Sequence, residues 1–246
     1  MSKTKVLVTG ANGYIGRHVV EQLLNMGADV LAADFSFDGV DERAQRVETP
    51  IFSGLEDIYE QMGKPDVCIH LAWRNGFVHN ADSHIEDLPN HYTFLKNMIE
   101  GGLKHVVVMG TMHEVGYWEG AIDENTPTNP LSLYGIAKNA LRQMVELLAK
   151  KSEVCFQWTR GYYIIGDDIK SNSIFSKIVQ AEQDQTERSD DEITKDIGVF
   201  DQVGKLIDGH KNLQKCALWA RLWPENISPA MRALPCLTAP GHRGLV

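Results

Sequence analysis

The sequence has few cysteines, and none of them lies at a spacing that suggests a metal site. Its four cysteines include no Cys-x-x-Cys pair, and its nine histidines include no His-x-x-x-His pair. Such pairs are common in zinc sites. Cys68 and Cys155 fall in predicted strands, where each is expected to pack as a small apolar residue. We therefore expect no metal and no disulfide framework. With no signal peptide before the first strand, the cytoplasm is the expected location.

Long apolar runs and a surplus of positive charge are also missing. No apolar run approaches the roughly 20 residues that a membrane-spanning helix needs. The formal net charge is -9, which disfavours nucleic acids and anionic membranes as partners. An anionic nucleotide substrate is not excluded, because local N–H groups and cations would bind it.

A glycine-rich turn near the N-terminus is flanked by a predicted strand and a predicted helix. Lys5 to Thr9 is a short β-branched run, as expected for a strand buried on both faces of a parallel sheet. From Tyr14 to Met26, apolar residues recur at helical spacing. Glycines at this spacing also occur in plain turns, but the flanking elements favour a dinucleotide-binding turn.

Each glycine of this turn has an expected role. Gly10 permits the tight turn, Gly13 lets the backbone approach a pyrophosphate, and Gly16 allows the helix to pack closely on the strand. The helix N-terminus, which begins at Tyr14 and Ile15, adds N–H groups and positive dipole charge for the phosphates.

The next predicted strand, 29–34, ends in Asp34. A carboxylate at this position can accept hydrogen bonds from the adenosine ribose hydroxyls and would repel a 2′-phosphate. The sequence therefore favours NAD over NADP. Arg17 could accommodate a phosphate, which keeps NADP as an alternative, and an acidic residue that merely starts a loop is the plainer interpretation of Asp34.

Strands and helices alternate along the rest of the N-terminal region. We predict strands at 66–70, 105–109 and 154–160 and helices at 88–100 and 133–150. This alternation predicts an α/β fold with a Rossmann-type, doubly wound parallel sheet. Ligands of such sheets bind beyond the carboxyl ends of the strands. We therefore expect Gly10, Asp34, Ala72 and Thr111 to meet at one crevice.

Tyr134 and Lys138 lie one helical turn apart and share a helix face. A tyrosine is a poor base at neutral pH, but a nearby ammonium and an oxidised nicotinamide ring both favour the phenolate. Tyr134 could then take a proton from a substrate hydroxyl, or in reverse protonate a ketone oxygen, while Thr111 holds that oxygen. The plainer alternative is a core tyrosine followed by a solvated lysine.

The chain resembles extended short-chain dehydrogenases/reductases of the NAD-dependent epimerase/dehydratase family, most of whose members act on nucleotide sugars. The resemblance covers about residues 3–180 and rests on several motifs that are specific only together. The matching residues are Thr9–Gly16, Asp34, His70–Ala72, Asn90, Thr111, Pro130, Tyr134–Lys138 and Arg160.

This resemblance implies a set of cofactor contacts. It places the pyrophosphate at Gly10, Gly13, Tyr14, Ile15 and Gly16, the adenosine ribose at Asp34, the wall of the cofactor site at Leu71 and Ala72, the support of the strand ends at Asn90, and the nicotinamide ribose at Lys138.

The segment after Thr111 departs from the family pattern. Dehydratase members carry an Asp-Glu pair directly after the threonine, whereas this chain has Met112 and His113, with Glu114 one residue further. A dehydratase is therefore disfavoured. His113 could be a second acid/base or a substrate hydrogen-bond donor, but an ordinary loop histidine is the preferred interpretation, and the same holds for Glu114.

A polar stretch between 74 and 91 holds Arg74, His79, His84 and His91. Because the histidine spacings do not fit a zinc site, we interpret the stretch as a polar lid over the cofactor and substrate. Arg74 is a candidate contact for a substrate phosphate or sugar.

The sequence predicts a dinucleotide-binding domain at 1–165 and a small, reduced or divergent substrate lobe at 166–246. A helix is expected at 173–183, and family resemblance fades after about residue 184. Residues 186–196 are polar and acidic, and four prolines interrupt the last segment. Three explanations stay open: a shortened lobe, a divergent lobe, or a frame change in the coding sequence that would leave the tail poorly packed.

The leading functional interpretation is an enzyme that oxidises or reduces a sugar carbon through NAD, foremost a nucleotide-sugar epimerase. A keto-sugar reductase is the second interpretation. A non-catalytic dinucleotide-binding protein with a defective substrate lobe is the third. By the resemblance, a homodimer would pair through the helices at 88–100 and 133–150.

Overall fold

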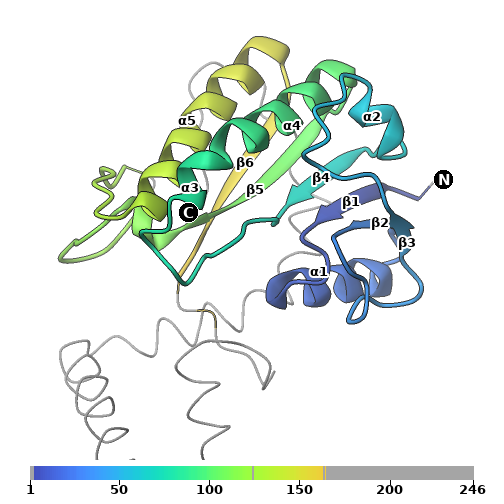
Figure 1. Ribbon diagram of the computed structural model, residues 1–246, viewed down its shortest axis with the longest axis horizontal. Coiled ribbons are helices and arrows are strands. Elements are labelled where there is room, and N and C mark those ends of the chain that lie inside the picture. Colours follow the sequence, from blue (N-terminus) through green and yellow to red (C-terminus); the bar gives the residue numbers. More distant parts are fainter. Residues whose placement is uncertain (1–2, 124, 163, 165–246) are drawn as a thin grey trace, which may run out of the picture. The chain divides into compact units, whose positions relative to one another are not determined.

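A parallel β-sheet lies at the centre of the computed structural model, which describes residues 3–123, 125–162 and 164 (Figure 1). Within these residues, six strands pair in the order β3-β2-β1-β4-β5-β6, and every pairing is parallel. The strands are β1 Lys5–Thr9, β2 Asp29–Ala33, β3 Gln45–Val47, β4 Val67–His70, β5 His105–Thr111 and β6 Cys155–Gly161. The predicted Rossmann-type α/β fold is confirmed.

Helices cover both faces of the sheet, as Figure 1 shows: α1 lies on one face, and α2, α4 and α5 lie on the other. The helices are α1 Tyr14–Asn25, α2 Ile58–Gln61, α3 Ser83–Glu86, α4 Leu88–Gly101 and α5 Leu133–Ser152, with a 3-10 turn η1 at Met112–Glu114. None of the helices in the described ranges is long and apolar enough to cross a membrane.

The core explains why the central strands carry uninterrupted apolar runs. Leu7 and Leu31 pack in one cluster with Phe94 of α4 and Leu141 of α5, and all four side chains are at most 2% exposed. Side chains alternate along a strand, so the neighbours of Leu7 point to the opposite face, which α1 covers. A strand buried on both sides has no polar face, and periodicity of two is therefore absent from its sequence.

Three short elements were not predicted from the sequence. In β3 only Val47 is buried, so its three residues carry no apolar pattern. The helices α2 and α3 each have four residues, too few for a helical repeat to show. The predicted helix at 173–183 and the tail after residue 184 lie outside the described residues.

The fold brings the predicted site residues to one edge of the sheet. The strands β1, β2, β4 and β5 run parallel, and their carboxyl ends carry Gly10, Asp34, Leu71 and Thr111 respectively. This edge is where ligands of open parallel sheets bind.

Candidate active site

The turn after β1 has no room for side chains at two of its glycines. Gly10 has a φ of +68°, and a Cβ there would lie 2.7 Å from the backbone N of Ala72. A Cβ at Gly16 would overlap the carbonyl oxygen of Gly10. At Gly13 a Cβ would meet only that same oxygen, at 3.1 Å. Gly10 and Gly16 thus allow close backbone packing, and a side chain at Gly13 would make one tight contact with the backbone of the turn.

The N-terminus of α1 carries neither a capping side chain nor a negative charge of its own. Gly13 is its N-cap residue, no side chain caps it, and its first turn holds no acidic residue. The side chain of Asn12 instead ties the turn to the loop after β2: it accepts from the Gly39 N–H at 2.8 Å and contacts the Ser36 hydroxyl at 2.6 Å. The positive end of the helix dipole at this turn favours a phosphate.

Asp34 lies directly beside this turn. One carboxylate oxygen accepts the Asn12 N–H at 2.8 Å, and the other accepts the Phe35 N–H at 2.7 Å. Each oxygen keeps a lone pair for a further donor such as a ribose hydroxyl. The Arg17 side chain of α1 packs against Gly39 in the loop after β2. The turn and Asp34 together fit the pyrophosphate and adenosine ribose of a dinucleotide.

The segment after β4 lies against the glycine turn. Ala72 packs against Gly10, and its N–H donates to the Thr9 hydroxyl at 3.4 Å. That hydroxyl also pairs with Nδ1 of His70 at 2.8 Å, and Nε2 of His70 pairs with Nδ1 of His91 at 2.9 Å. Burial lowers the pKa of His70 to about 3 and also lowers that of His91. Both imidazoles are therefore neutral at pH 7, and this segment is held by uncharged hydrogen bonds.

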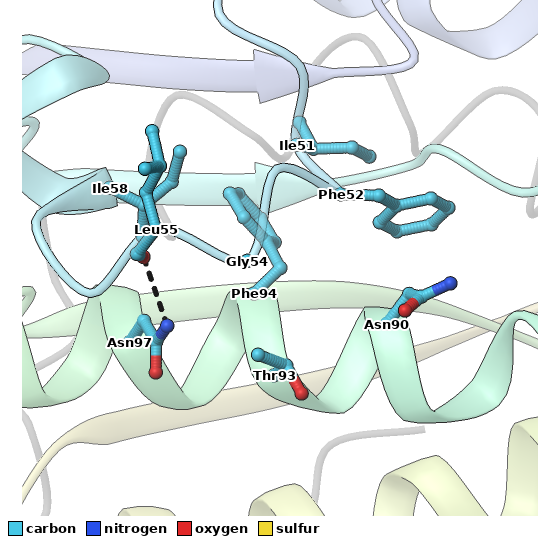
Figure 2. A pocket seen from close by; sticks show the side chains of 9 residues that line it. All are labelled: Ile51, Phe52, Gly54, Leu55, Ile58, Asn90, Thr93, Phe94 and Asn97. Atoms are coloured by element: carbon cyan, nitrogen blue, oxygen red, sulfur yellow. Dashed lines mark hydrogen bonds between the residues drawn. The ribbon is translucent and has the colours of Figure 1, made fainter.

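Asn90 is exposed on α4 and lines a small cavity between that helix and the loop after β3. Figure 2 shows Asn90 and Phe52 at one end of this cavity and Leu55 and Asn97 at the other. The Asn97 amide donates to the Leu55 carbonyl at 2.9 Å, which holds the loop on the helix. The support of the strand ends by Asn90 stays a prediction.

The helix α5 begins under a loop that fixes its first turn. Ser132 is the N-cap residue, and its hydroxyl accepts the Gly135 N–H at 3.2 Å. The Tyr134 N–H donates to the His79 carbonyl at 2.9 Å, and the Leu133 N–H donates to the Asn80 side chain at 3.2 Å. Three N–H groups of the first turn are thus satisfied, and the position of Tyr134 is set by the 75–82 loop.

Tyr134, Thr111 and Lys138 come together at the end of β5. The Thr111 side chain lies close enough to Tyr134 to lower the pKa of the tyrosine. Lys138 is 1% exposed, and its ammonium donates to the Met109 carbonyl at 2.6 Å and lies 4.0 Å from the centre of the Trp73 ring. The ammonium is therefore held by one carbonyl and by a cation–π contact.

Burial dominates the electrostatics of this pair. Burial raises the pKa of Tyr134, the Thr111 side chain lowers it, and the charge of Glu114 raises it. Burial lowers the pKa of Lys138 to about 7, and Glu114 opposes this. The sequence predicted a Tyr134 pKa lowered by Lys138 and by an oxidised nicotinamide ring; without the cofactor, burial of Tyr134 is the largest effect and raises its pKa.

Lys138→Met is expected to change how stability depends on pH. The folded pKa of Lys138 is about 7, against an ordinary value of 10.5. Between these values the unfolded chain binds a proton that the folded protein does not, so the free energy of unfolding of the parent protein rises with pH across this window. Below pH 7 the charged ammonium is buried at full cost. The stability advantage of Lys138→Met should therefore be largest there and shrink toward pH 10.5.

Urea unfolding at several pH values measures this difference. The matched control is Lys150→Met on the same helix, where the side chain is 70% exposed. A Lys138→Met difference that stays constant from pH 6 to pH 10 would contradict the account.

An aromatic cluster that the sequence did not predict surrounds Tyr134. The centre of its ring lies 5.1 Å from that of His84, 5.7 Å from His113 and 6.0 Å from His79. The Trp73 indole N–H donates to His84 at 3.0 Å. The density of histidines between 79 and 91 was the only signal in the sequence, and it did not reveal which of them face the tyrosine.

The polar stretch that was interpreted as a lid divides into different environments. His79 and the buried His84 lie beside Tyr134, whereas the buried His91 stacks on Trp73 at 4.3 Å. Arg74 is paired with Asp87 and Glu86 on its own loop and helix. Among the described residues, no group of three or more His, Cys, Asp or Glu side chains is placed to hold a metal ion.

The residues after Thr111 also take different positions. His113 is half-buried, and its ring centre lies 4.1 Å from that of His79; burial, followed by the charge of His79, lowers the pKa of His113. Glu114 is fully buried, and its carboxylate accepts the Thr111 N–H at 2.7 Å and the Arg160 guanidinium at 3.2 Å. No pattern in the sequence indicates that Glu114 is buried.

The sequence of the chain is similar to that of a known family of enzymes. A sequence model of the NAD dependent epimerase/dehydratase family matches residues 6–194. The dTDP-6-deoxy-L-talose 4-dehydrogenase (NAD(+)) of Aggregatibacter actinomycetemcomitans is 46% identical over 189 residues, which cover 74% of this chain and 69% of the relative. A UDP-glucose 4-epimerase of Lactobacillus helveticus is 26% identical over 233 residues, which cover 84% of this chain and 70% of the relative.

Solved structures share the fold at lower identity. The UDP-glucose 4-epimerase of Thermotoga maritima with UDP-glucose superposes with a TM-score of 0.64 at 22% identity, over 72% of this chain and 62% of that structure. The UDP-glucose 4-epimerase of Brucella ovis in complex with NAD gives a TM-score of 0.59 at 21% identity, over 69% and 55%. The chain thus spans about three-fifths of the length of these structures.

Proposed function

The chain belongs to the NAD-dependent epimerase/dehydratase family, and we propose that it is an oxidoreductase that transfers a hydride between NAD and a ring carbon of a nucleotide-linked sugar. The side chains of Tyr134 and Thr111 lie near each other at the carboxyl end of β5, and this placement carries the proposal. They lie at the same edge of the sheet as the glycine turn and Asp34, where a dinucleotide fits.

The substrate we propose is a dTDP-linked 6-deoxyhexose, oxidised at its C4 hydroxyl, or the corresponding 4-ketone in the reverse direction. The support is the 4-dehydrogenase at 46% identity, compared with 26% for the Lactobacillus epimerase. The chain also lacks the Asp-Glu pair of dehydratases, because Met112 and His113 occupy those positions.

The residues that would hold NAD lie at the ends of three strands. Gly10, Gly13 and Gly16 with the N-terminus of α1 would bind its pyrophosphate, Asp34 its adenosine ribose, and Ala72 would pack against it. NAD supplies the acceptor for the hydride that leaves the sugar carbon. Lys138 would contact the nicotinamide ribose through an N–H donor other than the one on the Met109 carbonyl.

Tyr134 would move the proton. The substrate hydroxyl would bind between Thr111 and Tyr134, and the tyrosine oxygen would accept its proton as the carbon is oxidised. In the reverse direction the phenol would donate a proton to the ketone oxygen. Because burial and Glu114 both raise the pKa of Tyr134, the protein without cofactor favours the phenol, the form that the reductive direction needs.

The substrate lobe and the partner subunit remain proposals as well. We assign the dinucleotide site to 1–165 and the larger part of the sugar site to 166–246. A homodimer would pair through α4 and α5, where Ile136 and Leu147 are exposed.

Incubation of the protein with NAD and dTDP-6-deoxy-L-talose tests the proposed function. We expect net formation of NADH in step with loss of the sugar, followed by absorbance and by chromatography. A changed sugar without net NADH would instead indicate an epimerase. Bound NAD, measured by calorimetry, with neither product would indicate a dinucleotide-binding protein without this activity.

A further inference from the structure

Glu114 is a buried carboxylate that the proposed chemistry does not use. Its side chain is 0% exposed. One oxygen accepts the Thr111 backbone N–H at 2.7 Å, and both oxygens lie 3.0 Å from the indole nitrogen of Trp158. The Arg160 guanidinium donates at 3.2 Å, and the Arg142 guanidinium lies 3.8 Å away. An isolated buried carboxylate is costly, and this set of donors supplies the hydrogen bonds and the positive charge that offset the cost of its burial.

The partners of Glu114 come from the elements that carry the site. Thr111 ends β5, Trp158 and Arg160 lie on the neighbouring strand β6, and Arg142 follows Lys138 by one turn of α5. The carboxylate therefore joins the end of β5 to β6 and to the helix that holds Tyr134.

Gly110 makes this contact possible. A Cβ at Gly110 would overlap both the indole nitrogen of Trp158 and an oxygen of Glu114. Glu114 and Thr111 also form a reciprocal cap: the Thr111 side chain accepts the His113 N–H at 3.3 Å while the Glu114 side chain accepts the Thr111 N–H. Glu114 thus holds the Thr111 backbone, and the His113 N–H holds the Thr111 hydroxyl.

We propose that Glu114 is a positioning residue that fixes Thr111 at the end of β5, beside Tyr134. This role rests on the proposed function, because it assigns Glu114 to the same reaction. Glu114 does not touch the substrate; it acts through Thr111 and through its charge.

The other charged and titratable groups near Tyr134 define the background of this effect. They are Lys138 on the same helix, His79 and His84 from the loop and helix after β4, and His113 from η1. The charge of Glu114 raises the pKa of both Tyr134 and Lys138, and burial is the larger cause for each. Removal of the Glu114 charge alone should therefore lower the pKa of Tyr134.

Glu114→Gln tests the role through the ionisation of Tyr134. The phenol is titrated by ultraviolet difference absorption, with a Tyr134→Phe partner of each variant subtracted to isolate its signal. We expect the pKa of Tyr134 to move to lower pH in Glu114→Gln. Glu146→Gln is the matched control, since Glu146 also pairs with Arg142 but is 37% exposed on the outer part of α5. An unchanged or raised Tyr134 pKa in Glu114→Gln, or an equal decrease in the control, would overturn the proposal.

A second variant decides the case if Glu114→Gln does not fold. Trp158→Phe keeps the Glu114 charge but removes one of its donors, so the less compensated carboxylate should raise the pKa of Tyr134. A lowered or unchanged value would overturn the proposal. The titration needs no turnover, so it decides the role of Glu114 even if no sugar is converted. With turnover, the pH profile of sugar oxidation should move to lower pH in Glu114→Gln.

Discussion

Tyr134→Phe is expected to lower turnover by about 10²–10⁴-fold, the usual contribution of a positioned acid/base group. The substitution removes only the hydroxyl and leaves the ring among its aromatic neighbours, so the fold should persist. Steady-state formation of NADH from the dTDP-sugar measures the loss, and calorimetry with NAD should show binding close to that of the parent protein.

Tyr59→Phe provides a matched control for this substitution. Tyr59 lies on α2, and its ring packs against Gly101 and Gly102 at the carboxyl end of α4. Loss of this hydroxyl should leave turnover unchanged. A Tyr134→Phe protein that turns over as fast as the Tyr59→Phe protein would show that Tyr134 does not move the proton.

Gly10→Ala is expected to weaken both the fold and NAD binding. A φ of +68° is costly for alanine, by about 1–2 kcal/mol. The new Cβ would also lie 2.7 Å from the backbone N of Ala72, and the displacement of packed backbone typically costs a further ~1–3 kcal/mol. Because Ala72 lies against the turn, the shift should reduce the affinity for NAD as well.

Gly27→Ala separates the cost of the positive φ from the cost of the clash with Ala72. Gly27 also has a positive φ, +84°, but a Cβ there meets nothing within 4 Å. This variant should show only the conformational cost and bind NAD normally. Urea unfolding and calorimetry of both variants measure the difference. Equal losses of stability with equal affinities for NAD would contradict the role of the Gly10–Ala72 contact.

The sequence predicts most of the sheet because its central strands are buried on both faces. The apolar runs that contain Leu7, Leu31, Cys68 and Val106 have no other explanation in a chain without long apolar segments. Elements such as β3 and α2 are held by their neighbours rather than by a pattern of their own. Only the folded structure reveals them.

The site was predicted as far as topology determines it. Parallel strands place Gly10, Asp34, Ala72 and Thr111 at one edge, and this holds in the structure. The surroundings of Tyr134 could not be predicted, because they depend on how side chains from distant segments pack. Trp73 meets Lys138 across the site, and no spacing in the sequence indicates this contact.

Glu114 is the clearest example of a residue whose surroundings could not be predicted from the sequence. A carboxylate in a loop is usually solvated, and the sequence offers no reason to expect otherwise. Its donors Trp158 and Arg160 come from β6. The register of β5 and β6, in which Gly110 pairs with Arg160, brings these two side chains next to Glu114. Such a network depends on strand register, which hydrophobic patterns alone do not fix at the ends of strands.

A crystal structure of the protein with bound NAD tests the central claim most directly. The account predicts that the adenosine ribose hydroxyls donate to the Asp34 carboxylate and that the nicotinamide ring lies beside the Tyr134 hydroxyl, with Lys138 at the adjoining ribose. A dinucleotide bound away from Asp34, or a Tyr134 hydroxyl directed away from the nicotinamide ring, would contradict it.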